Sequence, residues 1–280
     1  MKITVLGSGG GEAYPATFCG CEHCNEARRV GGKSIRTLSQ TLINDDLLID
    51  YPSDTAEHAR RYGLNLGDVG NILITHTHTD HFAPAELLLR GVYYAHNMRC
   101  PELNLYGSSD VRRVFNGIKS LYSCHPEIEK SISTSICEPY GKYAIGSYTV
   151  TALPARHNKR LECLNYIITD GKSTLIYFHD TGLPDEEIMA YLENEGIRAD
   201  CVMMDATMGV AEVSDHGGHM SFEQNKRLAA TLRERRIADA HTLLVANHIT
   251  HNHAKTHENI EQIFEGTGIV VAYDGMVIDI

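Results

Sequence analysis

The chain has 280 residues, of which 42% are hydrophobic and 22% charged, and its formal net charge is −11. This composition is typical of a folded protein with a large core, so we expect one α/β domain over residues 1–280. No apolar run reaches the roughly 18 residues that span a bilayer, and Met1–Gly7 reads as a strand, which predicts a cytoplasmic protein without a membrane partner. The negative charge and the absence of a basic run argue against long nucleic acids.

Short apolar runs of strand length alternate with amphipathic helical stretches, and this alternation indicates an α/β fold. Strands are predicted at Lys2–Leu6, Gln40–Ile43, Leu47–Asp50, Ile72–Thr75, Tyr148–Leu153, Leu164–Ile168, Thr174–Phe178, Cys201–Met204, Thr242–Val245 and Met276–Ile280. The turn-rich residues 44–46 predict a hairpin between the second and third strands. Helices are predicted at Asp54–Tyr62, Ser108–Leu121 and Asp185–Glu195, and from Ser221 onward, where Gln224 completes a capping box. Residues 91–147 are the least regular, and we expect an inserted loop or cap there.

Four residues of metal-ligating type follow the fourth predicted strand, namely His76, His78, Asp80 and His81. Residues two apart on a strand point to the same face, so His76 and His78 present two imidazoles side by side. The chain then turns, so that Asp80 and His81 can point at a second metal position nearby. A helix is predicted to start within residues 83–89. Imidazole and carboxylate groups suit zinc, iron or manganese. The pattern therefore predicts a site for two metal ions.

This pattern resembles the His-x-His-x-Asp-His motif of the metallo-β-lactamase superfamily. The resemblance implies an αββα sandwich, in which two mixed β-sheets are flanked by helices. It also implies three further ligands from later strand ends, which in this chain are His157, Asp180 and His248. The two implied metal sites consist of His76, His78 and His157 and of Asp80, His81 and His248, with Asp180 bridging both.

Three of the eight cysteines crowd into one loop, as Cys19, Cys21 and Cys24. Metal binding explains this spacing better than disulfides do, and three thiolates are one ligand short of a tetrahedral zinc site. The loop resembles that of the phosphoribosyl 1,2-cyclic phosphate phosphodiesterases (PhnP-like) of phosphonate catabolism, in which it pairs with a histidine three residues after the last catalytic one. That position is His251 here. In the alternatives, the thiols stay free or the fourth ligand is His23 or His253. The other five cysteines are expected to be small core residues: Cys100, Cys124, Cys137, Cys163 and Cys201.

The cyclic phosphodiesterases and tRNA-processing ribonucleases of this fold carry an extra histidine on a loop before a helix. His216 and His219 lie on such a loop, and His219 directly precedes the helix predicted from Ser221. We therefore assign His219 as the general acid, keep His216 as the alternative, and place Asp80 with His219 among the catalytic residues. Asp205 either orients an active-site histidine or forms a turn.

Together these features predict a binuclear metal-dependent phosphodiesterase that hydrolyses a small diester. The substrate would be cyclic, such as a phosphoribosyl cyclic phosphate, or a nucleotide. The cofactors would be two divalent catalytic ions, Mn²⁺ or Zn²⁺, and one structural Zn²⁺. One alternative is a metallo-hydrolase of a thioester, lactone or other acyl substrate, and another is a non-catalytic metal-binding accessory protein. A homodimer is compatible with the sequence.

Overall fold

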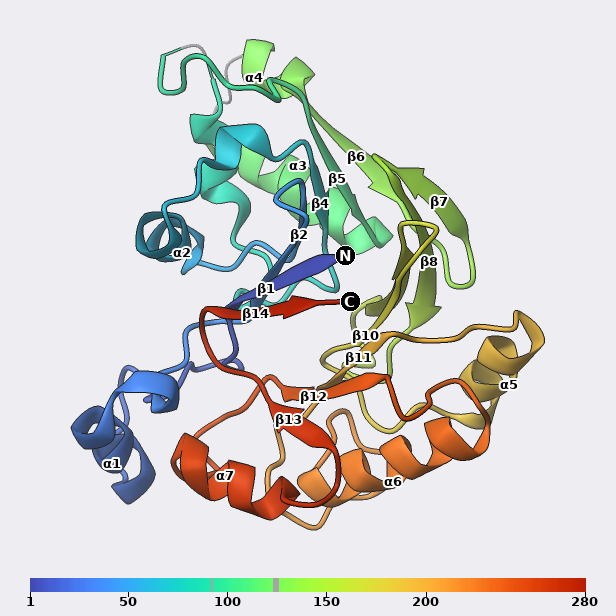
Figure 1. The fold of residues 1–280 in the computed structure, drawn as a ribbon. Coiled ribbons are helices and arrows are strands. Elements are labelled where there is room, and N and C mark those ends of the chain that lie inside the picture. The colour runs from blue at the N-terminus through green and yellow to red at the C-terminus, as the bar shows by residue number, and fades with distance from the viewer. Residues whose placement is uncertain (92, 123–125) are drawn as a thin grey trace.

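Two β-sheets face each other in the computed structural model, which describes residues 1–91, 93–122 and 126–280 (Figure 1). The first sheet contains, in spatial order, β14 (Met276–Asp279), β1 (Lys2–Gly7), β2 (Gln40–Ile43), β3 (Leu47–Ile49), β4 (Asn71–Leu73), β5 (Leu103–Gly107) and β6 (Ile132–Ile136). The second contains β13 (Ile269–Val271), β12 (Leu243–Asn247), β11 (Cys201–Asp205), β10 (Thr174–Phe178), β9 (Leu164–Thr169), β8 (Tyr148–Pro154) and β7 (Lys142–Ile145).

Each sheet is mixed, with a parallel half and an antiparallel half. Strands β3 to β6 run parallel, whereas β14, β1, β2 and β3 pair antiparallel. In the second sheet β10 to β13 run parallel and β7 to β10 antiparallel. The predicted hairpin between β2 and β3 is present, and Asn44 and Asp45 turn it with positive φ angles of 46° and 65°.

Helices cover the outer faces of the two sheets (Figure 1). They are α2 (Thr55–Tyr62), α3 (Ser109–Leu121), α4 (Pro126–Ser131), α5 (Glu186–Asn194), α6 (Phe222–Glu234) and α7 (His257–Phe264), whereas α1 (Glu22–Val30) lies beside the sandwich. The capping box of α6 is formed, because the Ser221 hydroxyl accepts from the Gln224 amide and the Gln224 side chain accepts from the Ser221 amide. Residues Pro84–Leu89, where a helix was predicted to start, form a 3₁₀ helix. The two sheets and these outer helices confirm the predicted αββα sandwich.

The core has an inner layer between the sheets and two outer layers under the helices. On β10, Leu175 and Tyr177 pack between the sheets, while Ile176 and Phe178 pack against the helix side. Successive side chains of a strand point to opposite faces, so a strand covered on both faces must be apolar throughout. This double burial holds the strand ends in fixed positions at the edge of the sandwich.

Residues 91–147, where an inserted loop or cap was expected, supply strands to both sheets. Strands β5 and β6 extend the first sheet, β7 begins the second, and α3 packs on β5 and β6. The irregular part of this segment is the stretch from Tyr93 to Glu102. The three strands and α3 are thus parts of the sandwich, and an inserted loop within 91–147 stays a prediction for the irregular stretch alone.

The scattered cysteines are mostly core residues, as predicted. Cys137, Cys163 and Cys201 are buried and Cys100 is half-buried, and all four are free thiols. Cys124 lies outside the described residues. Among the described residues, no helix is long and apolar enough to cross a membrane.

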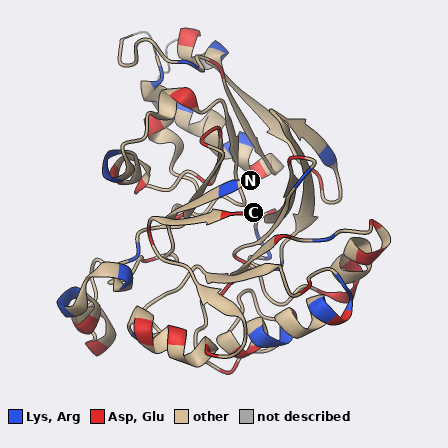
Figure 2. Cartoon of the chain, viewed as in Figure 1, with Lys and Arg blue, Asp and Glu red and all other residues tan. Residues whose placement is uncertain are grey.

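Acidic and basic residues are interspersed on α6, whereas α5 and α7 carry acidic residues without Lys or Arg (Figure 2). Arg235, at the end of α6, pairs with Glu186 at 2.6 Å and with Glu193 at 3.0 Å on α5. Exposed pairs of this kind contribute little to stability. They do neutralise the charge of Arg235, and Arg227 on α6 is likewise paired with Asp215 at 2.8 Å.

Candidate metal centre

The predicted metal ligands gather at one edge of the sandwich, just beyond the ends of four strands. His76 and His78 follow β4, His157 follows β8, Asp180 follows β10, and His248 follows β12. The bends that bring them together require unusual backbone conformations. Asp180 and His248 have positive φ angles of 45° and 59°, a region that residues other than glycine seldom adopt. Such conformations persist only where the surrounding structure imposes them, and they cluster at functional sites.

Three histidines form the first group of ligands. The Nε2 atom of His76 lies 2.9 Å from Nδ1 of His78, and Nε2 of His157 lies 3.0 Å from the same atom. Ligand nitrogens of a tetrahedral zinc ion lie about 3.3 Å apart, given Zn–N bonds of about 2.0–2.1 Å. Burial and the neighbouring His81 hold the pKa of His76 well below its usual range, so this ring is neutral and able to bind a metal.

A second group of ligands surrounds Nε2 of His81. This atom lies 3.1 Å from the Asp80 carboxylate, 2.9 Å from that of Asp180 and 3.2 Å from Nε2 of His248. His81 and His248 are buried, and Asp80 is only 13% exposed. These four side chains therefore converge on a second position where a divalent ion could bind.

Asp180 lies between the two groups. Its Oδ2 atom is 3.3 Å from Nε2 of His76 and 2.9 Å from Nε2 of His81. Burial alone would raise the pKa of this carboxyl, but His248 and His81 hold it well below its usual range. Its other oxygen, Oδ1, lies 2.9 Å from Nδ1 of His248. An ionised buried carboxylate that contacts histidines of both groups fits the bridging position of a two-metal site.

Asp50 and Thr207 support the ligands, and the sequence analysis missed both. Asp50 accepts a 2.7 Å hydrogen bond from Nδ1 of His81, which leaves Nε2 free to bind a metal. Thr207 places its hydroxyl 2.7 Å from Nδ1 of His248. The only sequence signal for Asp50 was its position at the end of a predicted strand, beside the strand that carries His76.

His219 lies at the mouth of the site, as predicted, whereas His216 does not. His219 lines a pocket of about 370 Å³ together with Asp80, Asp180 and His248, and His216 is exposed outside it. Nδ1 of His219 is 2.9 Å from a carboxylate oxygen of Asp205. Burial lowers the pKa of His219, but the Asp205 carboxylate outweighs this, so that the pKa lies above its usual value. Of the two roles considered for Asp205, the geometry favours orientation of His219.

The cysteine loop forms a separate group with His251. Nδ1 of His251 lies 3.7 Å from the sulfur of Cys19 and 3.5 Å from that of Cys21, and Cys24 completes the group. Sulfur and nitrogen ligands of a tetrahedral zinc ion lie about 3.6 Å apart, given bonds of about 2.3 and 2.0–2.1 Å. His23 instead places its ring 3.0 Å from the carbonyl of His251. The four residues therefore fit a structural zinc site, and His23 is not part of the group.

The thiols of this group differ in acidity. A hydrogen bond from the Cys24 amide, together with His251, lowers the pKa of Cys21 to about 6, whereas burial raises that of Cys24 to about 11. On the far side of the His251 ring, Nε2 lies 3.1 Å from a carboxylate oxygen of Glu12. A carboxylate behind a histidine fixes its tautomer and orients the ring toward a metal.

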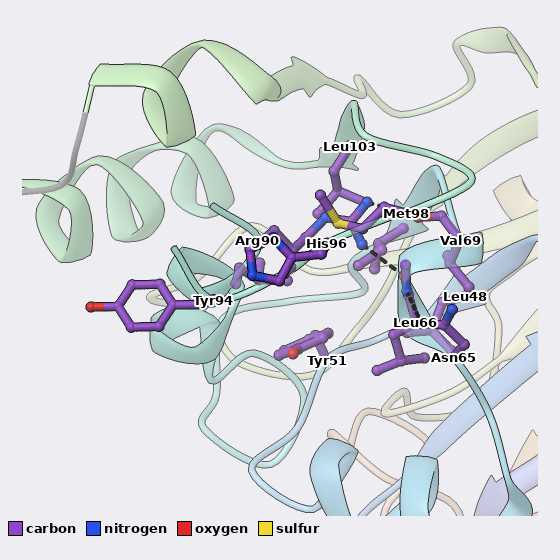
Figure 3. Close-up of a pocket in the computed structure, with 14 residues that line it drawn as sticks. Leu48, Tyr51, Asn65, Leu66, Val69, Arg90, Tyr94, His96, Met98 and Leu103 are labelled. Atoms are coloured by element: carbon purple, nitrogen blue, oxygen red, sulfur yellow. Dashed lines mark hydrogen bonds between the residues drawn. The ribbon is translucent and has the colours of Figure 1, made fainter. Parts of the chain in front are cut away.

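A further cavity, of about 300 Å³, lies on the outer side of the first sheet (Figure 3). Leu48, Tyr51 and Met98 line it, and Arg90 donates hydrogen bonds to the carbonyls of Leu66 and Cys100 at its wall. None of the predicted site residues lines this cavity.

The chain belongs to the beta-lactamase superfamily, because residues 47–242 match the model of the beta-lactamase superfamily domain. Its fold is similar to the crystal structure of a new diphosphatase from the PhnP family, with a TM-score of 0.74, 20% identity, and coverage of 100% of this chain and 97% of that one. It is also similar to Zn²⁺-bound PqqB from Methylobacterium extorquens, with a TM-score of 0.71, 17% identity and full coverage of both chains. At these identities the likeness shows the fold alone.

A short stretch of the sequence is also similar to a protein of cofactor synthesis. Over 46 residues the chain is 37% identical to coenzyme PQQ synthesis protein B of Bradyrhizobium diazoefficiens. The match spans 16% of this chain and 15% of that protein.

Proposed function

We propose that this protein is a metal-dependent phosphodiesterase that hydrolyses a small, cyclic diester such as a phosphoribosyl cyclic phosphate or a nucleotide. The observation that carries the proposal is the position of His219, paired with Asp205 at the mouth of a pocket lined by ligands of a two-metal site. The cofactors would be two divalent ions, Mn²⁺ or Zn²⁺, held by the two histidine groups and Asp180, and one structural Zn²⁺ held by the cysteine loop and His251.

The ligand groups fit metal ions by their chemistry and by the convergence of their ring nitrogens. Two divalent ions bound there would lower the pKa of water and neutralise charge on the phosphate. Asp50 and Thr207 would keep His81 and His248 oriented toward the site. His219, with its raised pKa, would hold a proton on the face of the pocket and donate it to the departing oxygen, a role worth on the order of 10² to 10⁴ in rate.

The expected partners follow from charge and from the thiols. A net charge of −11 and neutralised basic residues favour a small substrate over a long nucleic acid. Three thiols and one histidine at metal-binding distances, together with four further free thiols among the described residues, favour a reducing compartment, which supports a cytoplasmic location. We keep a homodimer as a proposal for solution measurements, and we expect no membrane partner.

Two other functions remain as alternatives. An acyl hydrolase of thioesters or lactones could use the same metals, but it would not need the His219 and Asp205 pair. A non-catalytic metal-binding accessory role, in which the protein keeps only the cysteine zinc, is the second alternative, and the similarity to a Zn²⁺-bound protein of PQQ synthesis is compatible with it. Metal analysis separates this role from catalysis, since it predicts one tightly bound zinc and no filled two-metal site.

Leaving-group dependence tests the proposed role of His219. The His219→Ala variant should lose about 10² to 10⁴ in kcat on diesters with alkoxide leaving groups and much less on those with nitrophenolate, which departs without a proton. His216→Ala, a change on the same loop outside the pocket, is the matched control and should keep its activity on both. Equal losses on both substrate types would refute the acid role. Hydrolysis of a thioester or lactone without hydrolysis of any diester would reverse the choice of substrate class.

A further inference from the structure

We propose that the groove beside the metal centre binds an uncharged planar ring of the substrate, with Phe18 stacking on that ring. The inference rests on the proposed function and narrows it: the diester carries a nucleobase-like group and not a second phosphate. Nothing in the His-x-His-x-Asp-His motif or the zinc ligands requires such a subsite. It follows from the shape, the exposure and the charge of the cysteine loop.

The groove is continuous with the metal centre. The pocket that contains His219 and Asp180, of about 370 Å³, adjoins a larger one of about 810 Å³. The two share Gly11, Glu12 and Asn252 as lining residues. A diester held at the metal centre can therefore extend one substituent into the larger groove.

Phe18 is the most exposed large apolar side chain of the described residues, at 103% relative exposure, and it lines the larger groove. A fully exposed phenylalanine gains nothing from burial in the folded protein, so its position is most useful if a ligand covers it. Cys19, the next residue, belongs to the zinc-site group, and its amide donates to the Ala16 carbonyl at 3.1 Å. The backbone beside Phe18 is thus held in place, which reduces the entropy lost when a ring stacks on it.

The charges of the groove favour an uncharged ring over a phosphate group. Its two acidic side chains, Glu12 and Asp54, are hydrogen-bonded to neighbouring residues. Glu12 accepts from the side-chain amide of Asn252 at 2.7 Å, and Asp54 accepts from the backbone amide of Leu38 at 3.0 Å. No Lys or Arg lines this groove among the described residues. A second phosphate would meet carboxylates without a balancing cation, whereas an uncharged ring would not.

Hydrogen-bonding groups line the same groove. Thr17 and Ser53 bring hydroxyls, which can donate to or accept from the edge of a heterocycle. Stacking on one aromatic face together with a few polar contacts at the ring edge is the usual way in which proteins hold an unpaired base. The larger groove therefore fits a nucleoside better than a phosphorylated sugar.

A binding experiment tests the subsite without relying on activity. The chain has no tryptophan, so Phe18→Trp introduces a single tryptophan at the groove, whose emission can be excited apart from that of the 14 tyrosines. In the metal-loaded variant, adenosine 5′-monophosphate should quench the emission at concentrations at which ribose 5-phosphate does not. Leu121→Trp, at an exposed position on α3, is the matched control and should respond to neither ligand. Equal quenching by both ligands, or none by the nucleotide, would overturn the inference.

A kinetic experiment then connects the subsite with turnover. For wild type, kcat/KM should be higher on adenosine 2′,3′-cyclic phosphate than on methyl riboside 2,3-cyclic phosphate, which lacks the base. Phe18→Ala should reduce this preference about 5- to 150-fold, as expected for loss of one stacking partner, and Leu121→Ala should leave it unchanged. An unchanged preference in Phe18→Ala, or a wild-type preference for a riboside with a second phosphate, contradicts the subsite. If no diester is hydrolysed while the nucleotide still quenches Phe18→Trp, the proposed reaction fails and the ring subsite stands.

Discussion

Replacing Asp50 by asparagine should weaken one of the two metal sites and spare the other. The Oδ1 atom of Asp50 accepts from the Thr75 amide at 2.8 Å, and Oδ2 accepts from Nδ1 of His81 at 2.7 Å. An asparagine has only one accepting oxygen, which the Thr75 amide requires. Its NH₂ group would then face Nδ1 of His81 and donate to it. The ring proton would move to Nε2, the atom that faces Asp180, and His81 would lose its free electron pair toward the metal.

The expected loss of metal affinity is limited because Asp50 hydrogen-bonds to only one of the proposed ligands, His81. Loss of such a supporting partner costs about 10- to 100-fold in metal affinity, which is about 1.4 to 2.7 kcal/mol. The group formed by His76, His78 and His157 makes no hydrogen bond to Asp50, so its affinity should change much less. Calorimetric titration of metal-free Asp50→Asn with Mn²⁺ or Zn²⁺ should therefore show one weakened step and one nearly unchanged step.

Asp45→Asn, at an exposed position of the β2–β3 hairpin, is the control for the loss of one carboxylate and should bind both ions as wild type does. Unchanged binding in Asp50→Asn would refute the tautomer argument. Equal weakening of both steps would show instead that Asp50 acts on the whole site through the fold.

The cysteine group and the buried His58 yield two further predictions. Cys21→Ser should lose one equivalent of zinc and melt at a lower temperature than wild type, even though a serine can still cap α1 as Cys21 does. The control Cys100→Ser should keep its zinc. Wild-type zinc content in Cys21→Ser would contradict the zinc site. Burial and the charge of Arg61 lower the pKa of His58 from 6.5 to about 4, so between these pH values the unfolded chain binds more protons than the folded one. The free energy of unfolding therefore decreases as the pH is lowered from 6.5 to 4, by up to about 3 kcal/mol. Urea unfolding of metal-free His58→Gln at pH 7 and 4.5 should show a smaller fall than wild type, and an equal fall would exclude His58 as its source.

Tertiary pairing decided several elements that local pattern did not reveal. Strands β5, β6, β7 and β13 were not predicted, and they lie at or near the sheet edges, where one face or one flank is less buried. Their apolar pattern is correspondingly weak, and pairing over long sequence separations supplies their stability. For the same reason the strands within residues 91–147 were not recognised from the sequence.

The sequence by itself determined the fold family and most of the candidate ligands, since His76 to His81 and Cys19 to Cys24 are short patterns whose geometry follows from local chain direction. Only the tertiary structure decided which distant groups meet them. It brought His251 and not His23 to the thiols, placed Asp50 behind His81, and set Phe18 beside the metal pocket. Such choices depend on where strands more than a hundred residues apart end in space, and spacing along the chain does not contain that information.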